Sequence, residues 1–245
     1  MNRVFFELCV ESLAAGRAAR VGGANRIELC SELAHGGVTP SAELMKADLK
    51  SLELPVYVLI RPRSGDFCFS QGEFEEMRRQ IGQAKRAGAE GIAVGILLED
   101  GRVDVERTRA LVEQARPLQV TFHRAFDETP DLFEALEDVI ETGADSLLTS
   151  GGARDVLSGA DMIGALKQRA GERIHVIAGG GLRLESLVEL VRRSGVYSLH
   201  GSLNRRNGAH QAAEHGGQLE ADVREAIRLL EAELRAMTPS IAPKR

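Results

Sequence analysis

Residues 4–30 read VFFELCVESLAAGRAARVGGANRIELC, and this stretch decides the fold. The apolar runs Val4–Cys9 and Arg26–Cys30 have the length and the Val, Ile, Leu and Phe content of buried strands. Between them, Ser12–Val21 has a helical pattern and ends at two glycines, which is typical of a helix C-terminus. The stretch therefore predicts a strand, a helix and a second strand parallel to the first.

The same strand–helix unit recurs along the chain. The glycine-alanine joint that follows the first helix returns at Gly88-Ala89 and Gly143-Ala144. We expect eight buried strands, at Val4–Cys9, Arg26–Cys30, Val56–Arg61, Gly91–Leu97, Leu118–His123, Ser146–Ser150, Ile174–Ala178 and Tyr197–Gly201. We expect eight helices, at Ser12–Val21, Ser41–Lys50, Glu73–Ala87, Asp104–Gln114, Asp131–Glu141, Ala160–Arg169, Leu184–Arg193 and Gln218–Arg235. This alternation predicts an α/β protein with a single (β/α)8 TIM barrel.

The rival architecture is an open, doubly wound sheet. The residues after the first strand, Val10-Glu11-Ser12-Leu13, lack the G-x-G-x-x-G pattern of a dinucleotide-binding fold, which favours the barrel. Because no shift in composition marks a domain boundary, we assign residues 1–237 to the barrel. Residues 238–245 contain two prolines and are expected to form a disordered tail. The polar stretch Asn204–Gly217 is expected to form a mobile loop over the barrel mouth.

The composition is that of an ordinary soluble globular protein, with 43% hydrophobic and 27% charged residues. The net charge of −5 argues against nucleic acid or an anionic membrane surface as a partner. There is no run of about 18 apolar residues, so no membrane span is expected. Three cysteines do not make a disulfide framework, and we therefore expect a reducing, cytoplasmic location.

Two of the expected strands end in the same tripeptide, Glu-Leu-Cys. Alternate residues of a strand share a face, so Glu7 lies with Cys9, and Glu28 lies with Cys30. Barrel enzymes have their active sites at the C-terminal ends of the strands, where these groups would meet. Thiolates select soft ions such as Cu(I) or zinc, and two cysteines without a matching histidine pair favour a two-coordinate soft ion. Alternatively, the two cysteines are small buried core residues.

Other expected strands also end in polar residues. His123 ends the fifth strand and Asp127 follows it, and together with Glu28 they are the candidate acid–base residues. The alternative role of His123 and Asp127 is to hold the loop in place. Arg61 ends the third strand and Arg63 follows it, and the two either bind an anion or neutralise the carboxylates inside the mouth.

Glycine-rich turns follow the last three strands. Barrels often bind phosphate with the loops after strands seven and eight, because backbone N–H groups in glycine-rich turns can approach an anion closely. Alternatively, these glycines only allow tight turns. The residues expected to bind a substrate or anion here are Ser150, Gly151, Gly179, Gly180, Gly181, Gly201 and Ser202.

Longer motifs surround several of these residues. They are Glu7-Leu8-Cys9, Arg26-Ile27-Glu28-Leu29-Cys30, Gly36-Gly37-Val38-Thr39-Pro40-Ser41, Ile60-Arg61-Pro62-Arg63-Ser64-Gly65-Asp66-Phe67, Thr121-Phe122-His123-Arg124-Ala125-Phe126-Asp127, Leu148-Thr149-Ser150-Gly151 and Ala178-Gly179-Gly180-Gly181. From about residue 4 to residue 202 the chain resembles the copper homeostasis protein CutC family. The resemblance implies a cytoplasmic, homodimeric (β/α)8 barrel linked to copper handling, with Cys9 and Cys30 as Cu(I) ligands.

Two functional hypotheses follow. The first is a cytoplasmic copper-homeostasis protein whose partner is a copper ion, bound as Cu(I) by two cysteines. The alternative is a barrel enzyme acting on a small phosphorylated or otherwise anionic metabolite, with His123 or Glu28 moving a proton. A purely structural or partner-binding barrel is disfavoured by the concentration of polar residues at one mouth.

Overall fold

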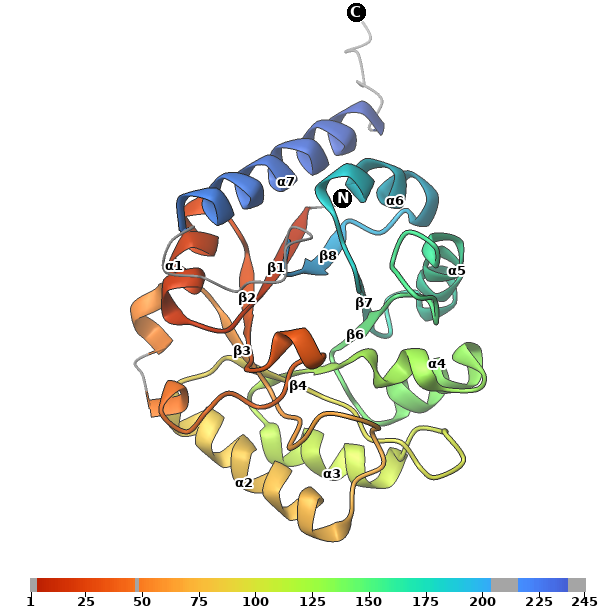
Figure 1. The fold of residues 1–245 in the computed structure, drawn as a ribbon. Helices are drawn as coiled ribbons and strands as arrows, with labels where there is room; N and C mark the ends of the chain where they lie inside the picture. The colour runs from red at the N-terminus through yellow and green to blue at the C-terminus, as the bar shows by residue number, and fades with distance from the viewer. Residues whose placement is uncertain (1–3, 47–48, 204–215, 238–245) are drawn as a thin grey trace, which may run out of the picture.

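The computed structural model describes residues 4–46, 49–203 and 216–237, which form a closed barrel of parallel strands inside a ring of helices (Figure 1). The predicted fold is confirmed. The strands follow each other in chain order, and the last pairs with the first to close the barrel. They are β1 Phe5–Val10, β2 Arg26–Leu29, β3 Val56–Leu59, β4 Gly91–Val94, β5 Gln119–Phe122, β6 Ser146–Thr149, β7 His175–Gly179 and β8 Ser198–Gly201.

The helices of the described chain cover the outside of the barrel (Figure 1). They are α1 Leu13–Gly22, α2 Gln71–Ala87, α3 Val105–Ala115, α4 Leu132–Glu141, α5 Ala160–Ala170, α6 Leu187–Ser194 and α7 Gly216–Met237. Short 3-10 helices lie at Leu33–His35, Leu44–Lys46, Leu49–Leu52, Arg124–Glu128 and Leu184–Ser186. The helix ends have defined caps: Gly23 is left-handed after α1, as the two glycines there predicted, and Ser70 and Glu73 form a capping box at the start of α2. None of the described helices is long and apolar enough to cross a lipid bilayer.

The expected helix at Ser41–Lys50 is wrong. The described part of this segment, which leads from β2 to β3, holds only the two short 3-10 helices. Met45, Leu49 and Leu52 are buried and follow each other at intervals of four and three residues, which imitates one face of an α-helix. Two separate 3-10 turns bury the same three side chains against the barrel. The spacing therefore predicted correctly which residues are buried, but it predicted an α-helix where the chain forms short turns.

Two other predictions lie outside the described residues. These are the tail at residues 238–245 and most of the predicted loop Asn204–Gly217, in which α7 already begins at Gly216.

The strands place apolar side chains outward and polar side chains inward at one part of the barrel. Ile27 faces α1: a Cβ at Gly16 would lie 3.1 Å from Ile27 Cδ1, so glycine permits this close packing. The alternate residues Arg26 and Glu28 are buried inside. In the register of the barrel, Glu28 pairs with Cys9 of β1. Charged and thiol groups therefore share the interior at the β8–β1–β2 part of the barrel.

Candidate metal centre at the barrel mouth

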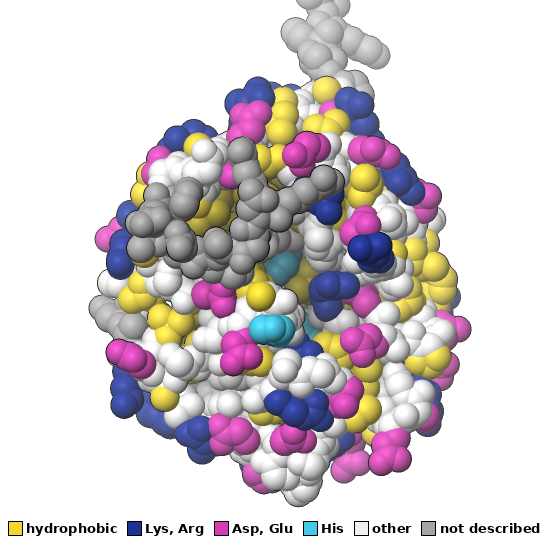
Figure 2. All heavy atoms as spheres, viewed as in Figure 1, with side chains coloured by type: hydrophobic (Ala, Val, Ile, Leu, Met, Phe, Trp, Pro, Cys, Tyr) yellow, Lys and Arg dark blue, Asp and Glu magenta, His cyan; other side chains and the backbone are white. Residues whose placement is uncertain are grey.

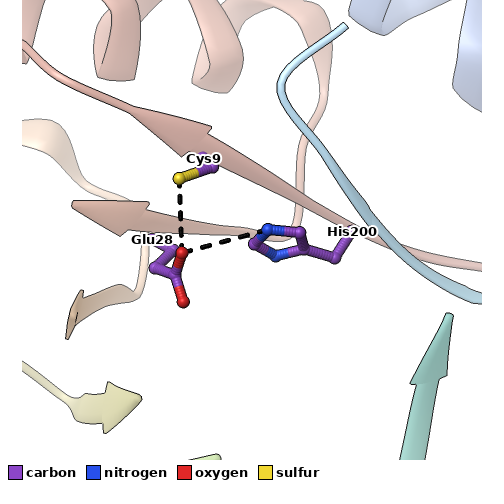
Figure 3. A group of neighbouring side chains, drawn as sticks. All are labelled: Cys9, Glu28 and His200. Atoms are coloured by element: carbon purple, nitrogen blue, oxygen red, sulfur yellow. Dashed lines mark hydrogen bonds and ion pairs between the residues drawn. The ribbon is translucent and has the colours of Figure 1, made fainter. Parts of the chain in front are cut away.

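Three side chains from three strands meet on the floor of the mouth (Figure 3). The thiol of Cys9 on β1 donates to Glu28 Oε2 of β2 at 3.2 Å. His200 Nε2 of β8 lies 3.9 Å from the same oxygen. All three residues are buried, and one potential ligand atom from each lies within 4.8 Å of the others. A thiol, a carboxylate and an imidazole thus converge on one small volume.

Cys30 adds a second sulfur to this group. Its Sγ atom lies 3.3 Å from Cys9 Sγ, and both side chains are buried. An ion held between two sulfurs on opposite sides would separate them by two metal–sulfur bonds, roughly 4.6 Å if each is about 2.3 Å long. The observed separation is shorter, so the pair fits an ion that sits to one side of both sulfurs rather than directly between them.

The carboxylate of Glu7 fixes the orientation of the His200 ring. His200 Nδ1 lies 2.7 Å from Glu7 Oε1, while the other Glu7 oxygen accepts a hydrogen bond from Arg26 Nε. The guanidinium of Arg26 stacks on Tyr57, 3.7 Å from the ring centroid. Because Nδ1 of His200 is held by a carboxylate, its Nε2 is the nitrogen that remains for a ligand. This carboxylate–histidine arrangement is typical of metal-binding histidines.

The protonation of this cluster follows from burial and from its neighbours. Contact with the Cys30 thiol raises the pKa of Cys9 well above its usual value, and burial and the charge of Glu28 act in the same direction. Burial raises the pKa of Glu28, although the charge of His200 opposes it. Burial lowers the pKa of His200, but the two carboxylates outweigh it and the net shift is upward. Without a metal ion, Cys9 is therefore a thiol.

Glu7 behaves in the opposite way. Burial raises its pKa, but the charge of Arg26 and the hydrogen bond and charge of His200 outweigh burial and lower the pKa to about 2. Glu7 is therefore a carboxylate at neutral pH, and it stabilises the charge of the residues that flank it.

The residues proposed for acid–base chemistry after β5 have different surroundings. The Asp127 carboxylate accepts hydrogen bonds from Arg124 Nε at 2.8 Å and from Thr149 Oγ1 at 2.5 Å. It also accepts from the backbone N–H groups of Ser150 and Gly152 in the loop after β6. Asp127 therefore joins the loop after β5 to the loop after β6.

His123 is buried at the end of β5 and lines the mouth. Its Nδ1 accepts a hydrogen bond from the backbone N–H of Ala125 at 3.2 Å. Burial, together with the charges of Arg61 and Arg124, lowers the pKa of His123 to about 3. The ring is therefore neutral at neutral pH and does not supply a proton as an imidazolium ion would.

The two arginines that were predicted to bind an anion lie in different surroundings. Arg61 lines the mouth and donates to the carbonyl oxygens of Gly36, Gly37 and Gly65. Arg63 forms ion pairs with Asp66 and Glu73 in the loop between β3 and α2. The buried Glu7 carboxylate forms its ion pairs with Arg26 and His200 instead.

The predicted anion-binding residues also fall into groups. Those that line the mouth are Gly180, Gly181, Gly201 and Ser202. Ser150 and Gly151 give their backbone N–H groups to Asp127 and Thr149, respectively. Gly179 ends β7 and packs closely on the next strand, where a Cβ would lie 2.9 Å from the backbone oxygen of His200. The backbone N–H groups of the glycine-rich turn after β6, which could have bound an anion, are thus already bound by the carboxylate of Asp127 and the hydroxyl of Thr149.

Sequence reasoning did not select Arg26 for this cluster, and it did not select His200 as a metal or acid–base candidate. Both were visible at alternate positions of their strands, Arg26 two residues before Glu28 and His200 two residues before Ser202. What the sequence did not contain is the register of β8 against β1, which pairs Glu7 with His200 across 193 positions of chain.

Comparison with known families gives one match that covers most of the chain. The model of the CutC family matches residues 4–205. A protein from Caulobacter vibrioides (strain NA1000 / CB15N), named as a family protein CutC, is 47% identical over 201 residues, which is 82% of each chain. The human copper homeostasis protein cutC homolog is 43% identical over 199 residues, covering 81% of this chain and 73% of the human one.

Solved structures show the same relationship. The crystal structure of a Streptococcus agalactiae protein described as CutC superposes with a TM-score of 0.76 at 29% identity, covering 82% of this chain and all of that one. Thiamine phosphate pyrophosphorylase from Pyrococcus furiosus superposes with a TM-score of 0.62 at 15% identity, over 94% of this chain and 96% of its own. At such low identity the second likeness shows the barrel fold alone.

Proposed function

This chain belongs to the CutC family, and from that premise we propose that it is a copper-homeostasis protein that binds Cu(I) through Cys9 and Cys30 at the C-terminal mouth of its barrel. The observation that carries the proposal is the pair of buried sulfurs 3.3 Å apart, one on β1 and one directly after β2, with His200 close to Cys9. Sulfur ligands favour soft ions such as Cu(I) or zinc, and the link of the family to copper homeostasis favours Cu(I).

The surrounding groups suit an ion that is taken up and released. His200 Nε2 offers a third ligand, while Glu7 fixes the ring through Nδ1. The Cys9 proton, now shared with Glu28, has to leave before a thiolate can bind the ion. Copper therefore replaces a proton in a cluster whose shape is already formed, so little rearrangement of the barrel is needed.

The wider setting belongs to the same proposal. Three free cysteines in the described chain suit a reducing, cytoplasmic location. A homodimer follows from the family resemblance, and residues 1–237 remain our assignment for the barrel domain. In this role the protein would buffer or carry copper for trafficking or tolerance.

An anaerobic Cu(I) competition titration against a coloured chelator tests the proposal. We expect one bound ion, and we expect Cys9→Ser and Cys30→Ser each to weaken binding by roughly 100-fold or more, since each removes a thiolate that oxygen does not replace. Cys68→Ser is the matched control, because Cys68 is a third free thiol that lies in a loop and donates to Leu98 O.

The outcome that contradicts the proposal is equally clear. If both Cys9→Ser and Cys30→Ser bind Cu(I) as tightly as the unaltered protein and Cys68→Ser, then the two buried cysteines are core residues and copper is bound elsewhere or not at all.

A further inference from the structure

The barrel mouth is much larger than a metal ion requires. A cavity of about 810 Å³ opens there, within the size range of small-molecule sites. Figure 2 shows the surface hollowed near its centre, with histidine and basic side chains around the hollow. Cys9, Glu28 and His200 line one part of this cavity, and the rest of its wall takes no part in the proposed copper site.

Arg124 offers an unused donor to the cavity. Its Nε donates to Asp127 at 2.8 Å and its Nη2 donates to Ser150 Oγ at 3.1 Å, and these two bonds hold the guanidinium in place. Its Nη1 has no partner among the described residues, and it is not one of their buried atoms that lack a partner, so it is accessible. Because the side chain is 41% exposed and lines the cavity, Nη1 can donate to a bound molecule.

The guanidinium of Arg124 lies against the glycine-rich turn after β7. A Cβ at Gly180 would lie 2.8 Å from Arg124 Cζ, so only glycine allows this contact. Gly180 and Gly181 have φ angles of 111° and 66°, which residues with side chains rarely adopt. Both glycines line the cavity. Since no side chain covers this turn, a bound molecule can approach its backbone closely.

The end of β8 belongs to the same wall. A Cβ at Gly201 would lie 3.1 Å from Leu182 Cβ, so β8 packs directly on the turn after β7. Ser202 is the next residue, and it lines the cavity. Its hydroxyl has no partner among the described residues and is not one of their buried atoms that lack a partner, so it too is accessible.

The backbone donors of the turn after β7 are also unused. No described residue accepts a hydrogen bond from the N–H of Gly180 or of Gly181. The turn after β6 differs, because its N–H groups at Ser150 and Gly152 already donate to Asp127. Of these two glycine-rich turns, the one after β7 is therefore the one that can accept an anion from outside the protein.

The charge of the lining also favours an anion. The cavity is lined by four arginines and three acidic residues: Arg61, Arg124, Arg154, Arg183, Glu28, Asp127 and Glu128. Arg154 and Arg183 are exposed, and neither forms an ion pair with another described residue. Asp127 is already paired with Arg124. The arginines thus leave positive charge over, and complementary charge favours a negatively charged ligand.

This set of donors suits a phosphate group. A phosphate monoester presents three terminal oxygens with up to two negative charges, and its usual partners in proteins are arginine, hydroxyl and backbone N–H groups. A carboxylate has two oxygens and one charge, so it would leave part of the donor set unused. A phosphate group fills only a small part of 810 Å³, which leaves room for an organic group.

We propose that the barrel mouth binds a small phosphorylated metabolite. Its phosphate accepts hydrogen bonds from Arg124, from Ser202 and from the backbone of Gly180 and Gly181, and its organic part lies in the remainder of the cavity. The phosphate site shares no residue with the copper ligands. It therefore goes beyond the proposed copper role and gives the mouth a second ligand.

The test is a calorimetric titration of the metal-free, reduced protein under anaerobic conditions with glycerol 3-phosphate, glycerol and lactate in turn. We expect glycerol 3-phosphate to bind with a dissociation constant in the millimolar range or tighter. Glycerol lacks the phosphate, and lactate carries a carboxylate in its place. We expect no binding of glycerol, and binding of lactate roughly tenfold weaker than that of glycerol 3-phosphate.

Two variants test the residues. Arg124→Gln removes the charge and Nη1, and we expect it to weaken binding of glycerol 3-phosphate by roughly tenfold or more. Ser202→Ala removes one hydroxyl and leaves the ion pair with Asp127 intact, and we expect a loss of about threefold. Arg102→Gln is the matched control: Arg102 also donates its Nε to an aspartate at 2.8 Å, but it lies outside the cavity lining.

Further measurements keep this proposal separate from the copper proposal. The unfolding midpoint shows whether each variant is folded, and the Cu(I) titration of each should match that of the unaltered protein. The phosphate proposal is overturned if glycerol 3-phosphate does not bind at millimolar concentration, or if lactate binds as tightly. It is also overturned if Arg124→Gln and Ser202→Ala, both folded, bind glycerol 3-phosphate as tightly as Arg102→Gln does.

Discussion

At the scale of single residues, the barrel interior keeps charges that an ordinary core would exclude. Glu7 and Arg26 are 2% and 7% exposed, and each has the other as a partner. Breaking a buried pair is far more costly than the pair is worth, because one charge is left without compensation. The main role of the ion pair is therefore to hold the Glu7 carboxylate in place rather than to stabilise the fold. The fixed carboxylate in turn orients the ring of His200.

His123 gives a pH prediction at this scale. The pKa of His123 is about 3 in the folded protein and 6.5 in the unfolded chain, so below pH 6.5 the unfolded state binds a proton that the folded state excludes. The stabilisation is complete above pH 6.5 and is lost as the pH falls toward 3. Between pH 6.5 and 4.5 the His123 contribution to the free energy of unfolding should fall by about 2 kcal/mol.

The measurement is urea unfolding at several pH values, compared with His123→Asn. Other groups titrate in both proteins and cancel in the difference, so the variant should lose about 2 kcal/mol less than the unaltered protein over this interval. Parallel curves for the two proteins would show that His123 takes up its proton as readily in the folded state.

At the scale of elements, a single side chain, that of Asp127, joins the segments that follow the neighbouring strands β5 and β6. Asp127, in the 3-10 helix after β5, accepts hydrogen bonds from Thr149, Ser150 and Gly152 in and after β6. This carboxylate fills the turn that would otherwise be open to an anion. It also fixes the wall of the mouth that begins at His123.

Asp127→Ala should therefore be strongly destabilising, because the Asp127 side chain is buried and accepts several hydrogen bonds. It leaves several donors without an acceptor, and we expect the free energy of unfolding to fall by roughly 2–4 kcal/mol. Asp131→Ala is the matched control: Asp131 caps α4 through the N–H groups of Phe133 and Glu134, and its loss should cost about 1 kcal/mol. Chemical unfolding of both variants checks the order, and equal losses would contradict the role given to Asp127.

At the scale of the whole molecule, the proposed copper ligands come from the strands that close the barrel. Cys9 lies on β1, Cys30 follows β2, and His200 lies on β8, so the site spans the junction between the two ends of the sheet. An ion bound there holds together strands that are far apart in the chain. Its binding energy therefore adds to the stability of the closed barrel.

We expect Cu(I) at 100 times its dissociation constant to raise the free energy of unfolding by about 2.7 kcal/mol. Anaerobic thermal unfolding with and without Cu(I) measures this as a higher melting temperature. A variant that carries both Cys9→Ser and Cys30→Ser should show no such shift, and a shift of equal size in that variant would place the stabilising ion elsewhere.

The sequence alone predicted the strands, most of the helices and the barrel, because these follow from local periodicity and from glycines at helix ends. Its one wrong helix, at Ser41–Lys50, has apolar residues at helical spacing, and spacing does not distinguish an α-helix from two short turns that bury the same side chains. It also placed Cys9 and Cys30 at the ends of their strands, each on the same face as a glutamate, because the face and the end of a strand are local properties.

Tertiary structure alone decided the partners of those residues. Closure of the barrel brings His200 against Glu7, and the strand register sets Glu28 against Cys9. The neutral state of His123 depends on burial and on Arg61, which is remote in sequence. Periodicity fixes which way a side chain points, whereas its charge and ligands depend on what other segments bring to it, and this is why the chemistry of the mouth appears only in the folded molecule.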